Sequence, residues 1–364
     1  MKYALIGCGR IAPNHIKAAL AAADRGLEIA AICDIVPEKA EALAERFELG
    51  DVPRYTDYKK MLADVAPGLV AVATESGSHA AVALDCIAAG CNVIIEKPIA
   101  LSMADARRIV SAADAAGVTV STNHQNRFNR SVQLARGAID DGRLGRLLHG
   151  SVHVLWGRDE KYYASGDWRG TWAEDGGTLM NQCIHGIDLL GWLMGGDISE
   201  VTALTARMNH PYIEAEDIGM ALVKFKSGAL GMIEGTTNVY DADMEETLYL
   251  FGTDGTVKLN GKAANKVGFW HVAGDSRDAA AISGEPETEI PGVYGKGHTA
   301  LYADVIDAIK TGREPYVTAR DGMRALETVL AIYKSAAEGR PVSLPLGECS
   351  TSTMDFCGRF DHIE

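Results

Sequence analysis

The stretch GCGRIA at residues 7–12 has the residue types that hold a dinucleotide. It fits the pattern G-x-G-x-x-G/A, follows a short apolar run, precedes an amphipathic stretch and is followed by Asp34 at the end of the next apolar run. Gly7 permits a tight turn, Gly9 lets backbone N–H groups approach a pyrophosphate, and Ala12 permits close packing of a helix on a strand. The alternative is a glycine-rich turn that binds no nucleotide.

Asp34 indicates which dinucleotide fits. A carboxylate at this position accepts hydrogen bonds from the diol of an adenosine ribose. The next residues, Ile35 and Val36, are not basic, so a 2′-phosphate would meet a negative charge and no cation. The pattern therefore favours NAD over NADP.

A second group of reactive residue types is EKP at residues 96–98. It lies at the expected end of a strand, and ligands of open α/β sheets bind at the carboxyl ends of the strands. A lysine ammonium there can stabilise negative charge on a reacting oxygen. The alternative is a surface lysine that ends the strand, with proline stopping the ladder.

A third group lies in GGTLMNQCIHGIDLLGWL at residues 176–193. If this stretch is one helix, Asn181, His185 and Asp188 occupy positions i, i+4 and i+7 and share a face. Either the core satisfies these polar groups, or they do chemistry, or they bind a metal. We expect no metal, because no further cluster of histidines or carboxylates accompanies them. The other faces carry Leu179, Ile184, Ile187 and Leu190.

The composition of the 364-residue chain excludes several classes of protein. Lys and Arg number 35 against 49 Asp and Glu, and a net charge of −14 disfavours nucleic acid and anionic membrane surfaces as partners. Seven cysteines without a C-x-x-C pair argue against a disulfide framework. The N-terminus has no signal-peptide pattern, so we expect a cytoplasmic protein.

The apolar pattern predicts two domains, at residues 1–121 and 122–364. In the first, short β-branched runs alternate with Ala-rich amphipathic stretches, which is typical of a doubly wound parallel sheet of the Rossmann type. Its expected strands are 2–6, 28–34, 69–74, 92–96 and 118–122, and its expected helices are 13–23, 37–47, 79–89 and 103–115.

The second predicted domain is α+β, built on a large and mostly antiparallel open sheet. We expect a helix at 130–140, a strand at 147–156, a helix at 179–194 and an antiparallel meander from 200 to about 259. A closing helix or helix pair at about 299–338 is expected to pack back toward the first domain. The tail at 350–364 has no predicted role.

Taken in order, these motifs resemble the glucose-fructose oxidoreductase/inositol dehydrogenase (Gfo/Idh/MocA) family. The resemblance covers essentially the whole chain and includes HQNRF at 124–128. Within the family, the strings WRGTW and MNQCIHGIDLLGWL look most like bacterial dehydrogenases that oxidise carbon 3 of UDP-N-acetylglucosaminuronate. Many members carry Asp where this chain has Asn181, and many carry Pro where it has Glu75.

The resemblance implies that the chain is an NAD-dependent dehydrogenase of a sugar secondary alcohol. His185 would accept the hydroxyl proton, Lys97 would stabilise the developing alkoxide and Asn181 would orient the sugar. Glu96 would hold the nicotinamide ribose or Lys97, and Asp188 would support the helix. We expect NAD to contact Gly7, Gly9, Arg10, Ile11, Asp34, Thr74, His79, Glu96, Lys97 and Gln125. We expect the sugar to contact Arg127, Tyr163, Trp168, Arg169, Asn181 and His185, the two arginines being candidates for carboxylate or phosphate oxygens.

Three alternatives stay open at this point: a dehydrogenase or reductase of a free cyclitol or monosaccharide, a non-catalytic NAD-binding regulator, and a glycosidase that uses tightly held NAD. Retention of both Lys97 and His185 argues against the regulator. The resemblance also predicts a cis Lys97–Pro98 bond. Apolar residues on both faces of the second sheet predict a homodimer or homotetramer.

Overall fold

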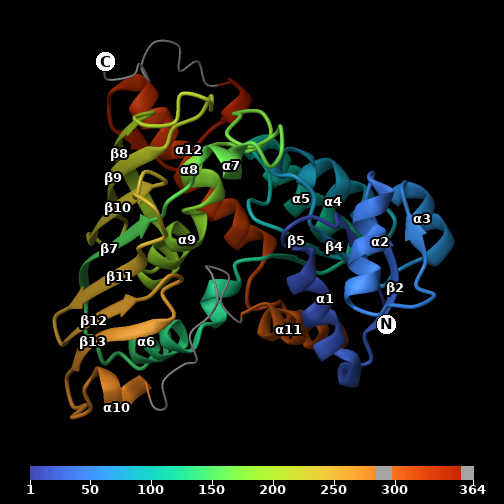
Figure 1. Ribbon diagram of the computed structural model, residues 1–364. Coiled ribbons are helices and arrows are strands. Elements are labelled where there is room, and N and C mark those ends of the chain that lie inside the picture. Colours follow the sequence, from blue (N-terminus) through green and yellow to red (C-terminus); the bar gives the residue numbers. More distant parts are fainter. Residues whose placement is uncertain (284–296, 354–364) are drawn as a thin grey trace. The chain divides into compact units, whose positions relative to one another are not determined.

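The computed structural model describes residues 1–283 and 297–353 of the chain, which fall into two compact units (Figure 1). The first unit comprises Met1–Gln125 and His298–Met323, and the second comprises Asn126–Gly297 and Arg324–Glu364. Most of the tail without a predicted role lies outside the described residues.

The first unit contains a six-stranded sheet in which all strands are parallel. Its order, β3-β2-β1-β4-β5-β6, is that of a doubly wound dinucleotide-binding sheet, with the switch point between β1 and β4. The predicted fold class is confirmed here. The strands are β1 (Lys2–Ile6), β2 (Glu28–Cys33), β3 (Arg54–Tyr55), β4 (Leu69–Val72), β5 (Asn92–Ile95) and β6 (Val120–Thr122).

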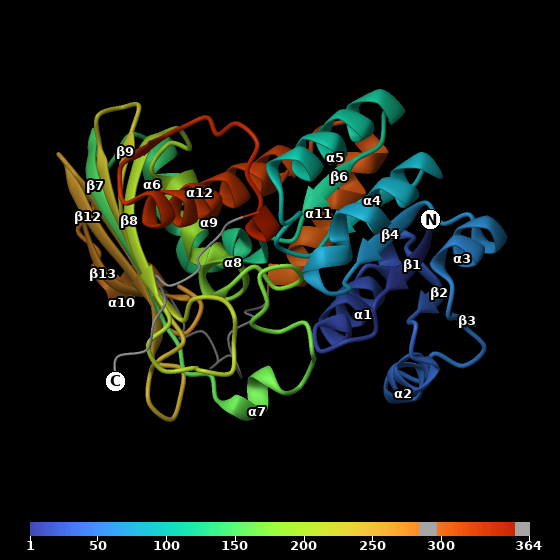
Figure 2. The same ribbon diagram turned by 90° about the horizontal axis from the view of Figure 1, so that it is seen from above.

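Helices cover both faces of this sheet, with α1 and α2 on one side and α4 and α5 on the other (Figure 2). Every side chain of β4 is fully buried as a result, which explains its uninterrupted apolar sequence. The helical segments are α1 (Ala12–Ala21), η1 (Ala23–Arg25), α2 (Pro37–Arg46), α3 (Tyr58–Val65), η2 (Ser76–Ser78), α4 (His79–Ala88), α5 (Met103–Ala116) and α11 (Gly297–Thr311).

The sequence patterns missed β3 and α3. The strand is only two residues long and is recognisable from its pairing with β2, in which Ile32 lies opposite Arg54. The helix has a clear local signal at its start, because the Asp57 carboxylate accepts hydrogen bonds from the N–H groups of Lys59 and Lys60.

The second unit contains an eight-stranded sheet in the order β13-β12-β11-β7-β10-β9-β8-β14. Only the β7–β10 pair is parallel. The predicted meander is therefore wrong in one respect: β7 lies between β10 and β11 and interrupts it. The strands are β7 (Leu147–Leu155), β8 (Ile198–Ala206), β9 (Ile218–Phe225), β10 (Leu230–Thr236), β11 (Glu245–Gly252), β12 (Gly255–Asn260), β13 (Lys266–Val272) and β14 (Val342–Ser343).

Helices α6, α9 and α12 pack on one face of this sheet (Figure 2). The predicted closing helix pair is present as α11 and α12, and its packing toward the first predicted domain stays a prediction. None of the helices in residues 1–283 and 297–353 is long and apolar enough to cross a membrane. The remaining helical segments are η3 (Gln125–Phe128), α6 (Arg130–Asp140), α7 (Glu160–Tyr163), α8 (Thr178–Asn181), α9 (Ile184–Leu193), α10 (Ala279–Ser283), α12 (Ala319–Glu338) and η4 (Thr351–Thr353).

The opposite face of the eight-stranded sheet is open and partly apolar. Side chains alternate strictly along β9, so Val223 is buried whereas Leu222 is 62% exposed. Leu204 on β8 is 78% exposed and Leu230 on β10 is 55% exposed on the same face. An apolar patch of this kind is seldom left open to water by a monomer.

We therefore expect the protein to form a homo-oligomer through this open face. Light scattering should give a mass of at least twice the 38.8 kDa of one chain. Leu222→Glu should lower that mass because it places a charge in the buried interface. Leu20→Glu, at an exposed leucine on α1, is the matched control and should leave the mass unchanged. A wild-type mass of one chain would contradict the prediction.

Candidate active site

The turn between β1 and α1 is shaped by two glycines that act differently. Gly7 has φ +96°, and a Cβ there would lie 2.4 Å from the carbonyl oxygen of Ala73, so only glycine fits. The Gly7 N–H donates to the carbonyl of Cys33 at 2.8 Å. At Gly9 a Cβ would meet no protein atom within 4 Å, which leaves the backbone open to a ligand. This arrangement fits a pyrophosphate at the start of α1.

Asp34 directly follows β2, and two backbone N–H groups fix its carboxylate. Its Oδ2 accepts the N–H of Cys8 at 2.8 Å, and its Oδ1 accepts the N–H of Val36 at 2.9 Å. The neighbouring Ile35 is 84% exposed and offers no charge. Arg10 and Ile11, also predicted to contact the cofactor, lie at the start of α1, where Arg10 is exposed and Ile11 partly exposed.

These contacts predict that the protein binds NAD more tightly than NADP. Bringing a 2′-phosphate to Asp34 would place like charges together without a compensating cation. Fluorescence titration with both cofactors measures the preference directly, and tighter binding of NADP would contradict it. The double variant Asp34→Ala/Ile35→Arg should shift the preference toward NADP, whereas Ile35→Ala should not.

The ends of β4 and β5 are tied together by His79. One ring nitrogen, Nδ1, lies 2.7 Å from the carbonyl oxygen of Pro98, and Nε2 lies 3.1 Å from that of Thr74. Burial lowers the pKa of His79, against the opposing effect of these carbonyls. The Lys97–Pro98 bond is cis, as predicted. A direct contact of His79 or Thr74 with NAD stays a prediction.

Glu96 is buried beside Lys97 and accepts a hydrogen bond from Nε2 of His15 at 2.8 Å. Burial alone would raise the pKa of Glu96, but the His15 contact and nearby positive charges, including that of Lys97, hold it below its usual range. Sequence reasoning missed His15, although it lies one turn after GCGRIA. Gln125, a further predicted cofactor residue, is buried at the start of η3.

In the second unit, the predicted helix at 179–194 is two helices, so that prediction is corrected. The Cys183 N–H bonds to the carbonyl of Thr178, five residues back, and this contact ends α8 before α9 begins. Asn181 therefore ends one helix and His185 lies in the first turn of the next. Both side chains are more than nine-tenths buried.

Asn181 is fixed by a neighbour that sequence reasoning did not select. The Asn181 side-chain amide donates to Oδ1 of Asp175, whose Oδ2 accepts the N–H of Gly170 at 2.7 Å. Gly186 lets α9 lie directly on β7, because a Cβ there would come within 2.9 Å of a valine methyl of the strand. The helix that carries His185 therefore packs closely on β7.

Arg127 forms a buried ion pair with Asp188. Its Nε donates to Oδ2 at 2.8 Å and its Nη2 donates to Oδ1 at 2.6 Å, with both side chains 3% exposed. The guanidinium carbon lies 4.9 Å from the centre of the Trp192 ring. Asp188 therefore anchors α9 to η3, the supporting role that we expected. Contact of Arg127 with a substrate stays a prediction.

Arg169 lies between two aromatic rings. Its guanidinium carbon is 4.5 Å from the centre of the Tyr162 ring and 4.3 Å from that of Trp168. Nη1 donates to the Tyr162 hydroxyl at 2.8 Å, and this oxygen also accepts from Nε2 of Gln182 at 2.9 Å. Tyr163, also predicted to bind substrate, is buried with its hydroxyl 3.1 Å from Oγ1 of Thr237.

Two glutamates of the second unit, Glu216 and Glu246, are fully buried. Glu216 accepts the Leu179 N–H of α8 at 2.7 Å and the Tyr333 hydroxyl at 2.8 Å. Glu246 has Asn126 as a hydrogen-bond donor at 3.4 Å. Burial raises the pKa of each carboxyl to about 8, although these hydrogen bonds act in the opposite direction.

This burial predicts that Glu216 and Glu246 contribute less to stability as pH rises from about 5 to 8. In that window the folded chain keeps protons that the unfolded chain has released, so the free energy of unfolding falls by up to ~1.4 kcal/mol per pH unit for each carboxyl. The free energy of unfolding in urea should depend less on pH in Glu246→Gln than in the wild type. In Glu245→Gln, a change at the partly exposed neighbour, its pH dependence should equal that of the wild type. A Glu246→Gln profile identical to wild type would contradict the assignment.

Comparison with protein families finds two models that match successive parts of the chain. Residues 1–124 match the oxidoreductase family with an NAD-binding Rossmann fold, and residues 136–344 match the C-terminal alpha/beta domain of the same oxidoreductase family. The chain belongs to the Gfo/Idh/MocA oxidoreductase family. The predicted family, fold class and NAD cofactor are confirmed.

Curated relatives of similar length act on sugars and cyclitols. D-apiose dehydrogenase of Paraburkholderia graminis is 29% identical over 354 residues, which are 94% of this chain and 89% of the relative. Myo-inositol 2-dehydrogenase of Thermotoga maritima is 28% identical and covers 94% of this chain and 98% of its own length. The protein is accordingly an NAD-dependent sugar or cyclitol dehydrogenase.

Solved structures with higher identity are dehydrogenases bound to a nucleotide sugar. The WlbA dehydrogenase from Bordetella pertussis, in complex with NADH and UDP-GlcNAcA, is 36% identical, with a TM-score of 0.83 over 95% of this chain and 99% of that chain. The WlbA dehydrogenase from Chromobacterium violaceum, with the same two ligands, is 37% identical, with a TM-score of 0.83 over 95% and 96% of the two chains.

Proposed function

We propose that the protein oxidises carbon 3 of a nucleotide-linked sugar, with UDP-N-acetylglucosaminuronate (UDP-GlcNAcA) as the first candidate. The observation that carries this proposal is the 36–37% identity to dehydrogenases bound to UDP-GlcNAcA, against 28–29% for the relatives named for free sugars and cyclitols. The strings around Asn181 and His185 support the same subgroup.

We assign one role in the reaction to each of several residues. His185, when neutral, accepts the proton of the sugar hydroxyl as general base. Lys97, as an ammonium, stabilises the negative charge that develops on the same oxygen. Asn181, held by Asp175, orients the sugar. Bound NAD supplies the hydride acceptor, and Gly7, Gly9 and Asp34 are the residues that would hold it.

Arg169 is the best candidate for the anionic part of such a substrate. It is half-buried and stacked between Tyr162 and Trp168, and no carboxylate in residues 1–283 and 297–353 forms an ion pair with it. A guanidinium fixed in this way is prepared to bind a carboxylate or a phosphate oxygen pair. Free cyclitols carry no such group.

A second candidate function, oxidation of a free cyclitol or monosaccharide, is favoured by the names of the curated relatives. A regulator without catalysis is disfavoured, because the chain keeps Lys97, His185 and the ribose-binding Asp34.

The deciding experiment measures NADH formation with a panel of substrates under identical conditions. The panel holds UDP-GlcNAcA, UDP-N-acetylglucosamine as a control that lacks the carboxylate, myo-inositol and D-apiose. We expect the highest kcat/KM for UDP-GlcNAcA. Turnover of inositol or apiose with none of either UDP-sugar would overturn the proposal in favour of the second candidate.

A further inference from the structure

A line of buried hydroxyl, imidazole and carboxylate groups runs through the first unit to Glu96. The Tyr3 and Tyr302 hydroxyl oxygens are 2.8 Å apart, and the Tyr302 hydroxyl is 2.6 Å from Nδ1 of His15. Nε2 of His15 is in turn 2.8 Å from Oε1 of Glu96. These four residues come from β1, α11, α1 and the end of β5, and none is more than 6% exposed.

The direction of the hydrogen bonds follows from the charge on Glu96. Because its pKa lies below the usual range, Glu96 is ionised and can only accept. Nε2 of His15 must therefore donate to it. Burial raises the pKa of Tyr3 and Tyr302, so both hydroxyls keep their protons. The Tyr302 hydroxyl then fixes the plane of the His15 ring through Nδ1.

The Glu96 carboxylate is held at both oxygens. Oε1 also accepts a hydrogen bond from Nδ2 of Asn123, and Oε2 accepts the backbone N–H of Lys97 at 3.2 Å. The positive charge of Lys97 is close enough to contribute to the lowered pKa of Glu96. The position of Lys97 therefore depends on that of the carboxylate, and the carboxylate depends on His15.

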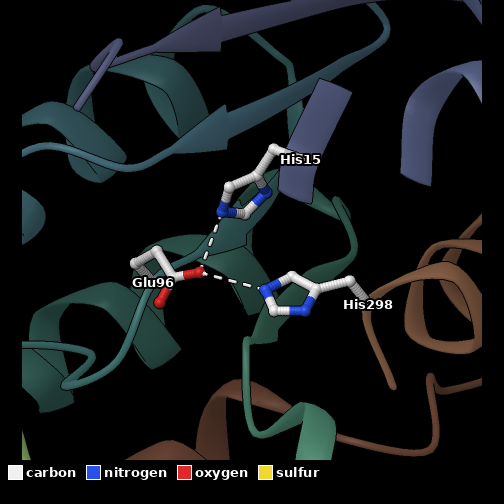
Figure 3. Close-up of side chains that lie close together, drawn as sticks. All are labelled: His15, Glu96 and His298. Carbon is white, nitrogen blue, oxygen red and sulfur yellow. Dashed lines mark hydrogen bonds and ion pairs between the residues drawn. The ribbon is translucent and has the colours of Figure 1, made fainter. Parts of the chain in front are cut away.

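The same place offers a possible metal site, because ligand atoms of His15, Glu96 and His298 all lie within 4.8 Å of one another. Figure 3 shows both imidazole rings directed at Oε1 of Glu96. The geometry favours hydrogen bonding: 2.8 Å between Nε2 of His15 and Oε1 is shorter than the ~3.3 Å expected between two ligands of one tetrahedral zinc. Nε2 of His298 is 3.9 Å from Oε1 of Glu96, beyond hydrogen-bond distance. Burial lowers the pKa of His298 to about 4, so its imidazole is neutral.

We propose that His15, oriented by Tyr302, is a positioning residue for Lys97 in the dehydrogenase reaction. Neither His15 nor Tyr302 touches the reacting atoms in this account. They hold the Glu96 carboxylate in place. The carboxylate in turn accepts the backbone N–H of Lys97 and places a negative charge near its ammonium group. The inference rests on the proposed catalytic role of Lys97, and it adds two residues from distant elements to the machinery that supports it.

The test compares His15→Gln with His15→Met, two side chains of the same length. Glutamine keeps a donor for Glu96, whereas methionine does not. We expect His15→Met to lower kcat by ~10²-fold, the effect of a small misplacement of a catalytic group, and His15→Gln to recover most of that loss. The KM for the sugar and the NAD affinity, measured by fluorescence titration, should change by less than about threefold in both.

Tyr302→Phe is a second test of the same contact, for the case in which His15→Met does not fold. It removes only the hydroxyl that orients the imidazole, so kcat should fall by about tenfold. Tyr58→Phe is the matched control: this tyrosine of α3 donates its hydroxyl to Asp85 at 2.7 Å, outside the line to Glu96, and the variant should keep wild-type kcat. In the NAD-free protein, nitrogen-15 NMR should show a protonated Nε2 in His15 of the wild type.

Parallel assays of Lys97→Ala separate the possible failures. If Lys97→Ala loses turnover while His15→Met and Tyr302→Phe keep it, the inference is wrong and the proposed function stands. If Lys97→Ala itself keeps wild-type turnover, both are wrong. One tightly bound zinc per purified chain, lost in His298→Ala, would also overturn the inference, because the three groups would then be metal ligands.

Discussion

Replacing Lys97 with alanine should lower kcat by at least ~10²–10³-fold while NAD affinity stays close to that of the wild type. The ammonium group is the donor that we assign to the developing alkoxide, and loss of one such donor typically costs this much. NAD affinity should be spared because the residues that we assign to the pyrophosphate and the adenosine ribose are Gly7, Gly9 and Asp34, at the ends of β1 and β2. Steady-state kinetics and fluorescence titration measure the two effects separately.

Lys17→Ala is the control for this experiment, because Lys17 is an exposed lysine on α1 of the same unit. It should have wild-type kinetics. Turnover of Lys97→Ala within tenfold of wild type would show that another group stabilises the alkoxide and that the assignment of Lys97 is incorrect.

Replacing His185 with alanine should lower kcat by ~10²–10⁴-fold, because the sugar hydroxyl then loses its general base. The wild-type kcat should rise with pH as the imidazole loses its proton, and this limb should disappear in the variant. The double variant with Lys97→Ala should lose less than the product of the two single losses, since both groups act on one oxygen.

Stopped-flow measurement of a single turnover with saturating NAD isolates the chemical step in His185→Ala. The matched control is His271→Ala, at an exposed histidine on β13. A single-turnover rate within tenfold of wild type, together with an unchanged pH profile, would mean that another residue is the base.

The parts of the fold that depend on local sequence were predictable. The glycines of the β1–α1 turn, Asp34 after β2 and the buried apolar strands each follow from a pattern within about 30 residues. The break between α8 and α9 was not predictable, because the apolar period continues through Cys183 and the break is visible only in the backbone contact with Thr178. The two-residue strand β3 carries too little pattern to be recognised.

The partners of the site residues were harder to predict than the residues themselves. Lys97, Asn181 and His185 stand in recognisable motifs. The groups that hold such residues lie far away in the sequence: Tyr302 is 287 residues from His15, and Arg127 is 61 residues from Asp188. Contacts over these separations depend on the tertiary fold, and no local pattern encodes them. The family resemblance named the reactive groups and two of their supports, Glu96 and Asp188, but not the distant residues that hold these supports.

The most direct test of the proposed reaction uses UDP-GlcNAcA that carries deuterium at carbon 3. After a single turnover with NAD, mass spectrometry of the reduced cofactor should find one deuterium per NADH, and the sugar product should be the 3-keto compound. Deuterium-free NADH formed with consumption of the substrate would place the oxidation at another carbon. Absence of NADH from this substrate, together with turnover of myo-inositol, would contradict the nucleotide-sugar assignment itself.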